Sequence, residues 1–132
     1  MATIDPTVVL LDAAAGVILV TWANLTQTNS DVGKAFTLAP KWVAFSDKSV
    51  QLDGTLGSGG TCIFEGSNQY QAANPTYATL HDPQGNALSM NALGIKQVLE
   101  VTGLVRPRIS AGDGTTSLTV SMIVVKHGSQ VG

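Results

Sequence analysis

Two histidines and one cysteine are the side chains of this sequence best suited to catalysis near neutral pH. His81 ends a predicted strand beside a turn, and His127 lies in a polar C-terminal tail. A hydrolase needs a nucleophile and a base within reach of one another, and neither histidine lies in a recognisable motif of that kind. Cys62 alternates with Phe64 along an apolar run, which is typical of a small buried hydrophobe. We therefore expect no catalytic residues, with a hydrolase that uses His81 as the alternative.

Metal and phosphate sites are equally poorly matched by the sequence. The carboxylates are dispersed, and the aspartates mostly precede Gly or Pro, where a side-chain oxygen binds nearby backbone amides in a turn. A single cysteine cannot build a cysteine-based zinc site. Residues 57–60 are glycine-rich like a phosphate loop, but the sequence that follows, 61–64, lacks the Lys-Ser/Thr pair such a loop needs. We expect a hairpin connection there, and we expect no metal and no cofactor.

The one concentrated positive feature is Arg106-Pro107-Arg108. Alternation along a strand places both arginines on one face, and Pro107 cannot donate a hydrogen bond to a ladder, which favours a sheet edge or a bulge. Arginine is common at interfaces because its planar guanidinium can hold a carboxylate with two donors. The pair therefore indicates either a contact with another subunit or, within the chain, an ion pair or a solvated face.

Composition points to a surface that partners cover. Only 12% of residues are charged, 44% are hydrophobic, and the formal net charge is −2. A free monomer usually carries about a quarter charged residues, so this shortage favours an assembled protein. The seven basic residues are scattered apart from the arginine pair, which argues against nucleic acid. No membrane span is expected, because residues 13–20 and 122–125 are far shorter than the roughly 20 residues required, and residues 1–6 do not resemble a signal peptide.

Most of the sequence has a hydrophobic period of two, which predicts β-strands. The clearest examples are residues 49–56 and 117–126, where apolar and polar side chains alternate. Richness in β-branched and aromatic residues predicts further strands at 17–25, 42–45, 61–65, 77–81, 95–101 and 104–109. Many short strands separated by turn residues are typical of a β-sandwich or barrel. We predict an all-β, single-domain β-sandwich.

Two segments leave the assignment open. Residues 91–101 also fit a helix with an Asn91 cap, although we favour a strand. Residues 7–15 are apolar without regular alternation, which an N-terminal arm packed on a neighbouring subunit would explain. The predicted organisation is an arm at 1–16, a sandwich domain at 17–127 and a short C-terminal tail at 128–132.

Apolar side chains outside the expected core mark candidate interface residues. Ile123 and Val125 interrupt the otherwise polar face of the last strand, and a large apolar side chain there is more useful against a neighbour than against water. Covering by a loop of the same chain is the alternative. The predicted partner interface comprises the following eight residues: Val8, Val9, Leu10, Leu11, Arg106, Arg108, Ile123 and Val125.

Several segments, taken in order, resemble small virion proteins of tailed bacteriophages. They are residues 50–56, 61–68 (with Phe64-Glu65-Gly66-Ser67-Asn68), 77–88 (with His81-Asp82-Pro83-Gln84-Gly85-Asn86), 105–109 and 112–120. Together they cover roughly residues 50–125. Within that group the sequence looks like a head decoration, or cement, protein.

The resemblance implies a jelly-roll β-sandwich that catalyses nothing and binds no cofactor. It implies a homo-oligomer, with a trimer favoured over a dimer, on the capsid exterior of the virion, after assembly in the host cytoplasm. Its other partner would be the major capsid protein, whose neighbouring copies it would bridge. The alternatives are a tail or baseplate component and a carbohydrate-binding module on the virion. The second arises because Gly66-Ser67-Asn68 and Thr79-Leu80 are also similar to discoidin-like and carbohydrate-binding sandwiches.

Overall fold

Twelve β-strands and no helix make up the part of the chain that the computed structural model describes, which is residues 2–12, 16–28, 30–37 and 47–125. Among these residues, no helix exists that could cross a lipid bilayer. In chain order the strands are β1 (Thr3–Ile4), β2 (Thr7–Asp12), β3 (Val17–Thr26), β4 (Val32–Gly33), β5 (Phe36–Thr37), β6 (Asp47–Thr55), β7 (Thr61–Ser67), β8 (Ala78–Thr79), β9 (Ser89–Met90), β10 (Gly94–Val98), β11 (Leu104–Ala111) and β12 (Ser117–Val125).

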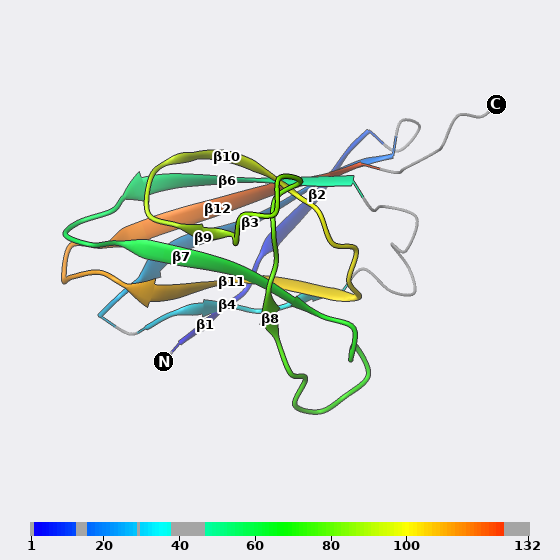
Figure 1. Cartoon of the computed structure of the whole chain (residues 1–132), viewed down its shortest axis with the longest axis horizontal. Helices are drawn as coiled ribbons and strands as arrows, with labels where there is room; N and C mark the ends of the chain where they lie inside the picture. The colour runs from blue at the N-terminus through cyan, green and yellow to red at the C-terminus, as the bar shows by residue number, and fades with distance from the viewer. Residues whose placement is uncertain (1, 13–15, 29, 38–46, 126–132) are drawn as a thin grey trace.

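The strands form two sheets that pack face to face (Figure 1). One sheet has five strands in the order β10-β6-β12-β3-β2, and every neighbouring pair in it is antiparallel. The other has seven strands, with β1-β4-β11-β7-β8 in its main path, β5 beside β11, and β9 beside β7. The predicted all-β sandwich is confirmed, while its jelly-roll form stays a prediction.

The core lies between the two sheets and follows the alternation in the sequence. In β12 the inward residues Val120 and Met122 are fully buried, whereas the intervening serines and threonine face outward. Trp22 of β3 packs edge to face on Phe64 of β7, with ring centroids 6.3 Å apart. Burying each such side chain contributes roughly 1.5 to 3 kcal/mol. Cys62 is part of this core, and burial raises the pKa of its thiol to about 12, so it is an inert hydrophobe as expected.

Most predicted strands are confirmed. Residues 94–98 form a strand, so the strand assignment rather than the helical alternative is correct in that region. Residues 77–81 yield only the two-residue β8 and an isolated bridge between His81 and Ala87. The predicted strand at 42–45, His127 and the tail at 128–132 lie outside the described residues.

The N-terminal segment is built into both sheets. Thr3 and Ile4 pair in parallel with β4 of the seven-stranded sheet, and β2 then pairs with β3 at the edge of the five-stranded sheet. The described part of the predicted arm therefore pairs with both sheets, while the predicted division at residue 16 stays a prediction. Backbone ladders on each side of residues 5–6 explain this placement, because strand pairing satisfies the amides that a free arm would leave to water.

Pro107 lies opposite a break in the ladder of β11. On one side of β11, Pro107 is opposite Phe64 of β7. On the other side, β11 pairs first with β5, where Val105 is opposite Phe36, and then with β4, where Arg108 is opposite Val32. The register therefore shifts by one residue between β4 and β5, at the position where Pro107 has no amide hydrogen to donate. The predicted sheet edge is therefore wrong, because β11 is internal, and the bulge in its pairing with β7 lies further along, between Ile109 and Ala111.

Asp113 ties together the two loops at one end of the sandwich. Its carboxylate accepts hydrogen bonds from the Thr115 hydroxyl at 2.7 Å, the Thr115 amide at 2.9 Å and the Ser58 amide at 2.9 Å. These donors hold the pKa of Asp113 down at about 2. The carboxylate therefore serves turn chemistry, as predicted for the aspartates that precede glycine.

This arrangement predicts a loss of stability in acid. Because the pKa of Asp113 is lower in the folded state than the ordinary 3.8, its stabilisation is present above pH 4 and is lost as the pH falls toward 2. We expect Asp113→Asn to lower the melting temperature at pH 6 and to leave a smaller difference between pH 5 and pH 2.5 than the unmodified chain shows. Thermal unfolding followed by circular dichroism measures both quantities, and an unchanged pH difference would contradict the assignment.

Candidate interface surfaces

One end of the outer face of the five-stranded sheet is apolar. Strand register places Ile123 of β12 directly beside Leu19 of β3, and Leu19 directly beside Val9 of β2. The next row pairs Val125 with Val17. These five residues, Val9, Val17, Leu19, Ile123 and Val125, are here called the apolar face. None of them is fully buried, and Val9 and Val125 are exposed.

Further along, the central strands of that outer face are polar. Two residues along from Ile123, the row contains Gln51, Ser121 and Thr21 and ends at the apolar Ile95 of β10. A further row contains Asp53 and Thr119. A shallow hollow beside the apolar face is lined by Ser49, Gln97, Ile123 and Val125 together with the flanking residues of β6. Contiguous apolar surface with a polar surround is typical of a protein interaction site.

β2 extends this surface around the edge of the sheet. It pairs only with β3 among the described residues, and its side chains Val8, Val9, Leu10 and Leu11 are each between 44% and 52% exposed. Val8 and Leu10 align with the buried Val20 and Ile18, so they face the inner side, yet they lie too far along the edge to be covered. The edge strand is thus apolar on both of its faces.

The structure brings together residues that the sequence predicted separately. Val9 and the pair Ile123 and Val125, more than 100 positions apart, share the apolar face, with Leu19 between them. Sequence analysis missed Val17 and Leu19. The sequence did contain a sign of them: residues 17–20 are all apolar, whereas a strand with only one buried face alternates apolar and polar residues. Such a run indicates that both faces of the strand are covered.

Arg106 and Arg108 lie on the other sheet and share one carboxylate. Their Nε atoms donate to Glu65 of β7 at 2.6 Å and 3.3 Å, and Glu65 is only 4% exposed. The Arg106 guanidinium also stacks on Tyr77, 3.6 Å from its ring centroid, and burial raises the pKa of that tyrosine. The predicted intrachain ion pair is therefore present, and two guanidiniums against one carboxylate leave a net positive charge. Contact of this pair with a partner stays a prediction.

Loss of Glu65 should destabilise the fold. We expect Glu65→Ala to lower the free energy of unfolding by about 2 kcal/mol, because two partly exposed arginines lose a charge-assisted hydrogen bond each. Urea unfolding monitored by tryptophan fluorescence gives the value. Arg108→Ala serves as the control, since it leaves Glu65 paired with Arg106 and should cost less; an equal loss in the two variants would contradict the shared pairing.

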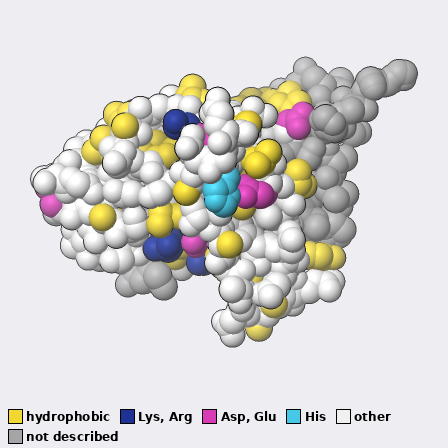
Figure 2. Space-filling view, viewed as in Figure 1, with side chains coloured by type: hydrophobic (Ala, Val, Ile, Leu, Met, Phe, Trp, Pro, Cys, Tyr) yellow, Lys and Arg dark blue, Asp and Glu magenta, His cyan; other side chains and the backbone are white. Residues whose placement is uncertain are grey.

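Charges are sparse elsewhere on the molecule. On the face shown in Figure 2, acidic and basic side chains form small separate spots, and histidine touches a carboxylate near the middle. That contact joins His81 Nδ1 to Glu100 at 2.6 Å, while the second oxygen of Glu100 accepts the His81 amide at 2.7 Å. Burial raises the pKa of Glu100, but the bonds from His81 outweigh it and hold the pKa below its usual value.

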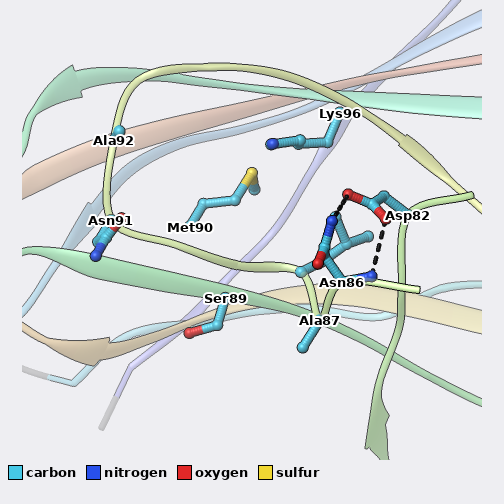
Figure 3. Close-up of a pocket in the computed structure, with 9 residues that line it drawn as sticks. Asp82, Asn86, Ala87, Ser89, Met90, Asn91, Ala92 and Lys96 are labelled. Atoms are coloured by element: carbon cyan, nitrogen blue, oxygen red, sulfur yellow. Dashed lines mark hydrogen bonds between the residues drawn. The ribbon is translucent and has the colours of Figure 1, made fainter. Parts of the chain in front are cut away.

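This pair lines one hollow, and a second lies at the neighbouring Asp82 turn. A groove of about 440 Å³ is lined by residues that include Asn68, Thr79, His81, Glu100 and Thr102. A smaller pocket contains the Asp82 turn, where the carboxylate accepts hydrogen bonds from the Gln84 and Asn86 amides, and Lys96 reaches across it from β10 (Figure 3). Within the residues that the structure describes, no three His, Cys, Asp or Glu side chains gather as a metal site would require.

Comparison with known proteins adds a fold relative. No protein-family model matches the sequence, and no curated protein matches it. Among solved structures, the SPBc2 prophage-derived protein YomS is similar with a TM-score of 0.55 and 16% identity, over 83% of this chain and 94% of YomS. CapF, solved with the inhibitor 3-isopropenyl-tropolone, aligns with 89% of this chain and 30% of its own at 9% identity, but its TM-score of 0.31 carries no argument. The likeness to YomS agrees with the all-β sandwich.

Proposed function

We propose that this chain is a non-enzymatic structural protein of a tailed-phage virion, which associates with copies of itself and decorates the outside of the head. Its partner there would be the major capsid protein, and its contacts would stabilise the joints between neighbouring capsid subunits. This role places it on the capsid exterior of the virion and, during assembly, in the host cytoplasm.

The apolar face together with the β2 edge is the observation that carries this proposal. Val9, Leu19 and Ile123 form one continuous row on the outer face of the five-stranded sheet, and the central strands carry polar side chains in the rows beyond it. Such a surface gains about 25 cal/mol for each Å² that a neighbour removes from water. One small contact is weak, but the symmetry of a shell repeats it many times, and the resulting avidity resists outward pressure.

The surroundings of His81 support a structural rather than a catalytic role. Its Nδ1 is held by Glu100, an arrangement that can also orient a catalytic base, but among the described residues no hydroxyl or thiol hydrogen-bonds to the imidazole. The only thiol in the sequence has its pKa raised by burial and is closed to solvent. Within the described part of the chain, neither Cys62 nor a hydroxyl hydrogen-bonded to His81 is therefore in place to act as the nucleophile of a hydrolase.

The fold relative supports the phage context. YomS is described as prophage-derived, and the two chains share a sandwich over most of their lengths. This likeness is the basis for a virion setting, whereas the place on the head follows from the resemblance of residues 50–125 to decoration proteins. A tail or baseplate position is the competing outcome of the test.

Electron microscopy of phage particles assembled with and without the chain tests the proposal. We expect added density, in symmetry-related positions on the outside of the head, only in particles that contain the chain. Density confined to the tail or baseplate would overturn the head assignment. Hydrolysis of a glycan or peptide by the purified chain, abolished by His81→Ala, would overturn the non-enzymatic role.

A further inference from the structure

The five-stranded sheet ends in two different edges, and both are apolar. At the end opposite β2, the strand β10 and the segment that follows it expose Ile95 at 64%, Leu99 at 54% and Val101 at 58%, with Leu93 close behind. Among the described residues β10 pairs only with β6, as β2 pairs only with β3. Each edge strand therefore has one unpaired side beside large apolar side chains, although just beyond β10 the Leu99 amide donates to the His81 carbonyl.

Both edges carry little of the usual protection against pairing. Natural sheets guard their edges with charges, prolines, bulges or very short strands. Residues 7–11 contain no charge and no proline, and β10 contains one charge, Lys96. β2 has a bulge near its far end, between Leu10 and Asp12, which leaves its first four residues in regular pairing. Edges left open in this way are suited to receive another strand.

The two edges are compatible with each other. All neighbouring pairs in the sheet are antiparallel, so with three strands between them β2 and β10 run in the same direction. A rotation about an axis along the strands therefore brings β2 of one copy beside β10 of the next. Asp5, exposed just before β2, and Lys96, exposed in β10, have opposite charges, so the approach is not repulsive.

Pairing of like edges would cover less surface. A two-fold contact between two β2 strands would leave Ile95 and Leu99 of both copies in water, and a contact between two β10 strands would leave Val8 to Leu11 exposed. A head-to-tail contact uses one edge of each kind, so every copy in a closed ring has both edges covered. This argument favours head-to-tail pairing over a dimer that joins like edges.

We propose that copies of this chain associate head to tail, the β2 edge of one against the β10 edge of the next, in a closed ring. The inference rests on the proposed self-association and specifies its geometry.

Complementation between two variants tests the ring. Val9→Lys/Leu11→Lys blocks the β2 edge, and Ile95→Lys/Leu99→Lys blocks the β10 edge; all four positions are exposed, so the lysine stems can lie on the surface without disturbing the core. We expect each variant alone to sediment as a single chain of 13.6 kDa. An equimolar mixture should form a complex of two chains and no larger, because one intact β2 edge can meet one intact β10 edge.

The controls separate the ring from the proposed function. Ala73→Lys, in an exposed loop of the seven-stranded sheet, should leave the assembly unchanged. Should the unmodified chain itself be monomeric, the proposed self-association fails and the ring with it. If the unmodified chain is an oligomer but the β10 variant assembles normally, or if the mixture forms no pairs, only the ring geometry is wrong. Pairing of like edges would then replace it.

Disulfide trapping provides a second measurement that does not depend on charged variants. The double variant Val9→Cys/Ile95→Cys should cross-link under oxidation into a ladder that ends at the ring size, and each single variant should stay uncross-linked. Cys62 is buried and does not compete. A covalent dimer from Val9→Cys alone would overturn the head-to-tail geometry.

Discussion

Val9→Asp/Ile123→Asp is expected to sediment as a single chain at concentrations where the unmodified protein is assembled. The two residues lie on either side of Leu19, so both carboxylates would lie within the apolar face that we propose neighbours cover. Assembly would then lose apolar burial and would also have to desolvate unpaired charges. We expect dissociation to become at least about 100-fold easier, which corresponds to about 2.7 kcal/mol.

A matched variant separates this effect from added negative charge. Ser117→Asp/Ser121→Asp introduces the same charge on the same outer face, on the central strand β12, but in its polar part. We expect this control to assemble like the unmodified chain. Equal dissociation of the two variants would assign the effect to net charge, and an intact oligomer in the Val9/Ile123 variant would remove the apolar face from the interface.

Trp22→Ala is expected to be the most destabilising single core substitution, with a loss of about 3 to 5 kcal/mol of unfolding free energy. Trp22 is fully buried, packs on Phe64 from the opposite sheet, and donates its indole N–H to the Lys34 carbonyl at 2.9 Å. Since domains are stable by only about 5 to 15 kcal/mol, the variant would approach the limit of folding. Urea unfolding followed by circular dichroism measures the loss.

Trp22→Phe separates packing from the hydrogen bond. The phenyl ring keeps much of the volume but leaves the Lys34 carbonyl without its donor, so we expect a smaller loss of about 1 to 2 kcal/mol. Gly33 permits this packing, because a Cβ there would lie 2.6 Å from both Trp22 and Pro107. A Trp22→Ala variant as stable as the unmodified chain would contradict the assigned core.

Hydrophobic alternation was sufficient to predict the sandwich and most of its strands. Residues 117–125 show why: every second side chain is apolar and buried, so the pattern records the burial directly. It did not predict how residues 2–12 are divided between the sheets. The side chains of β2 are exposed on both of its faces. Hydrophobic alternation reports which face is buried, so it gives no information about a strand that buries neither face.

The candidate surface needed the strand register as well as the sequence. Val9 and Ile123 could each be chosen as apolar residues out of place, but only the pairing of β2 with β3 and of β3 with β12 makes them neighbours. The same limit applies to Glu65, which pairs with Arg106 from 41 positions away, and to Glu100, which holds His81. Long-range contacts of this kind leave no local signal in one sequence.

Sedimentation equilibrium of the unmodified chain is the most direct test of the claim that neighbours cover the exposed apolar surface of the five-stranded sheet. We predict a mass that is a whole multiple of 13.6 kDa at micromolar concentrations, falling toward one chain only on strong dilution. A mass of 13.6 kDa at every concentration, in a protein that still shows a β-sheet spectrum, would contradict it.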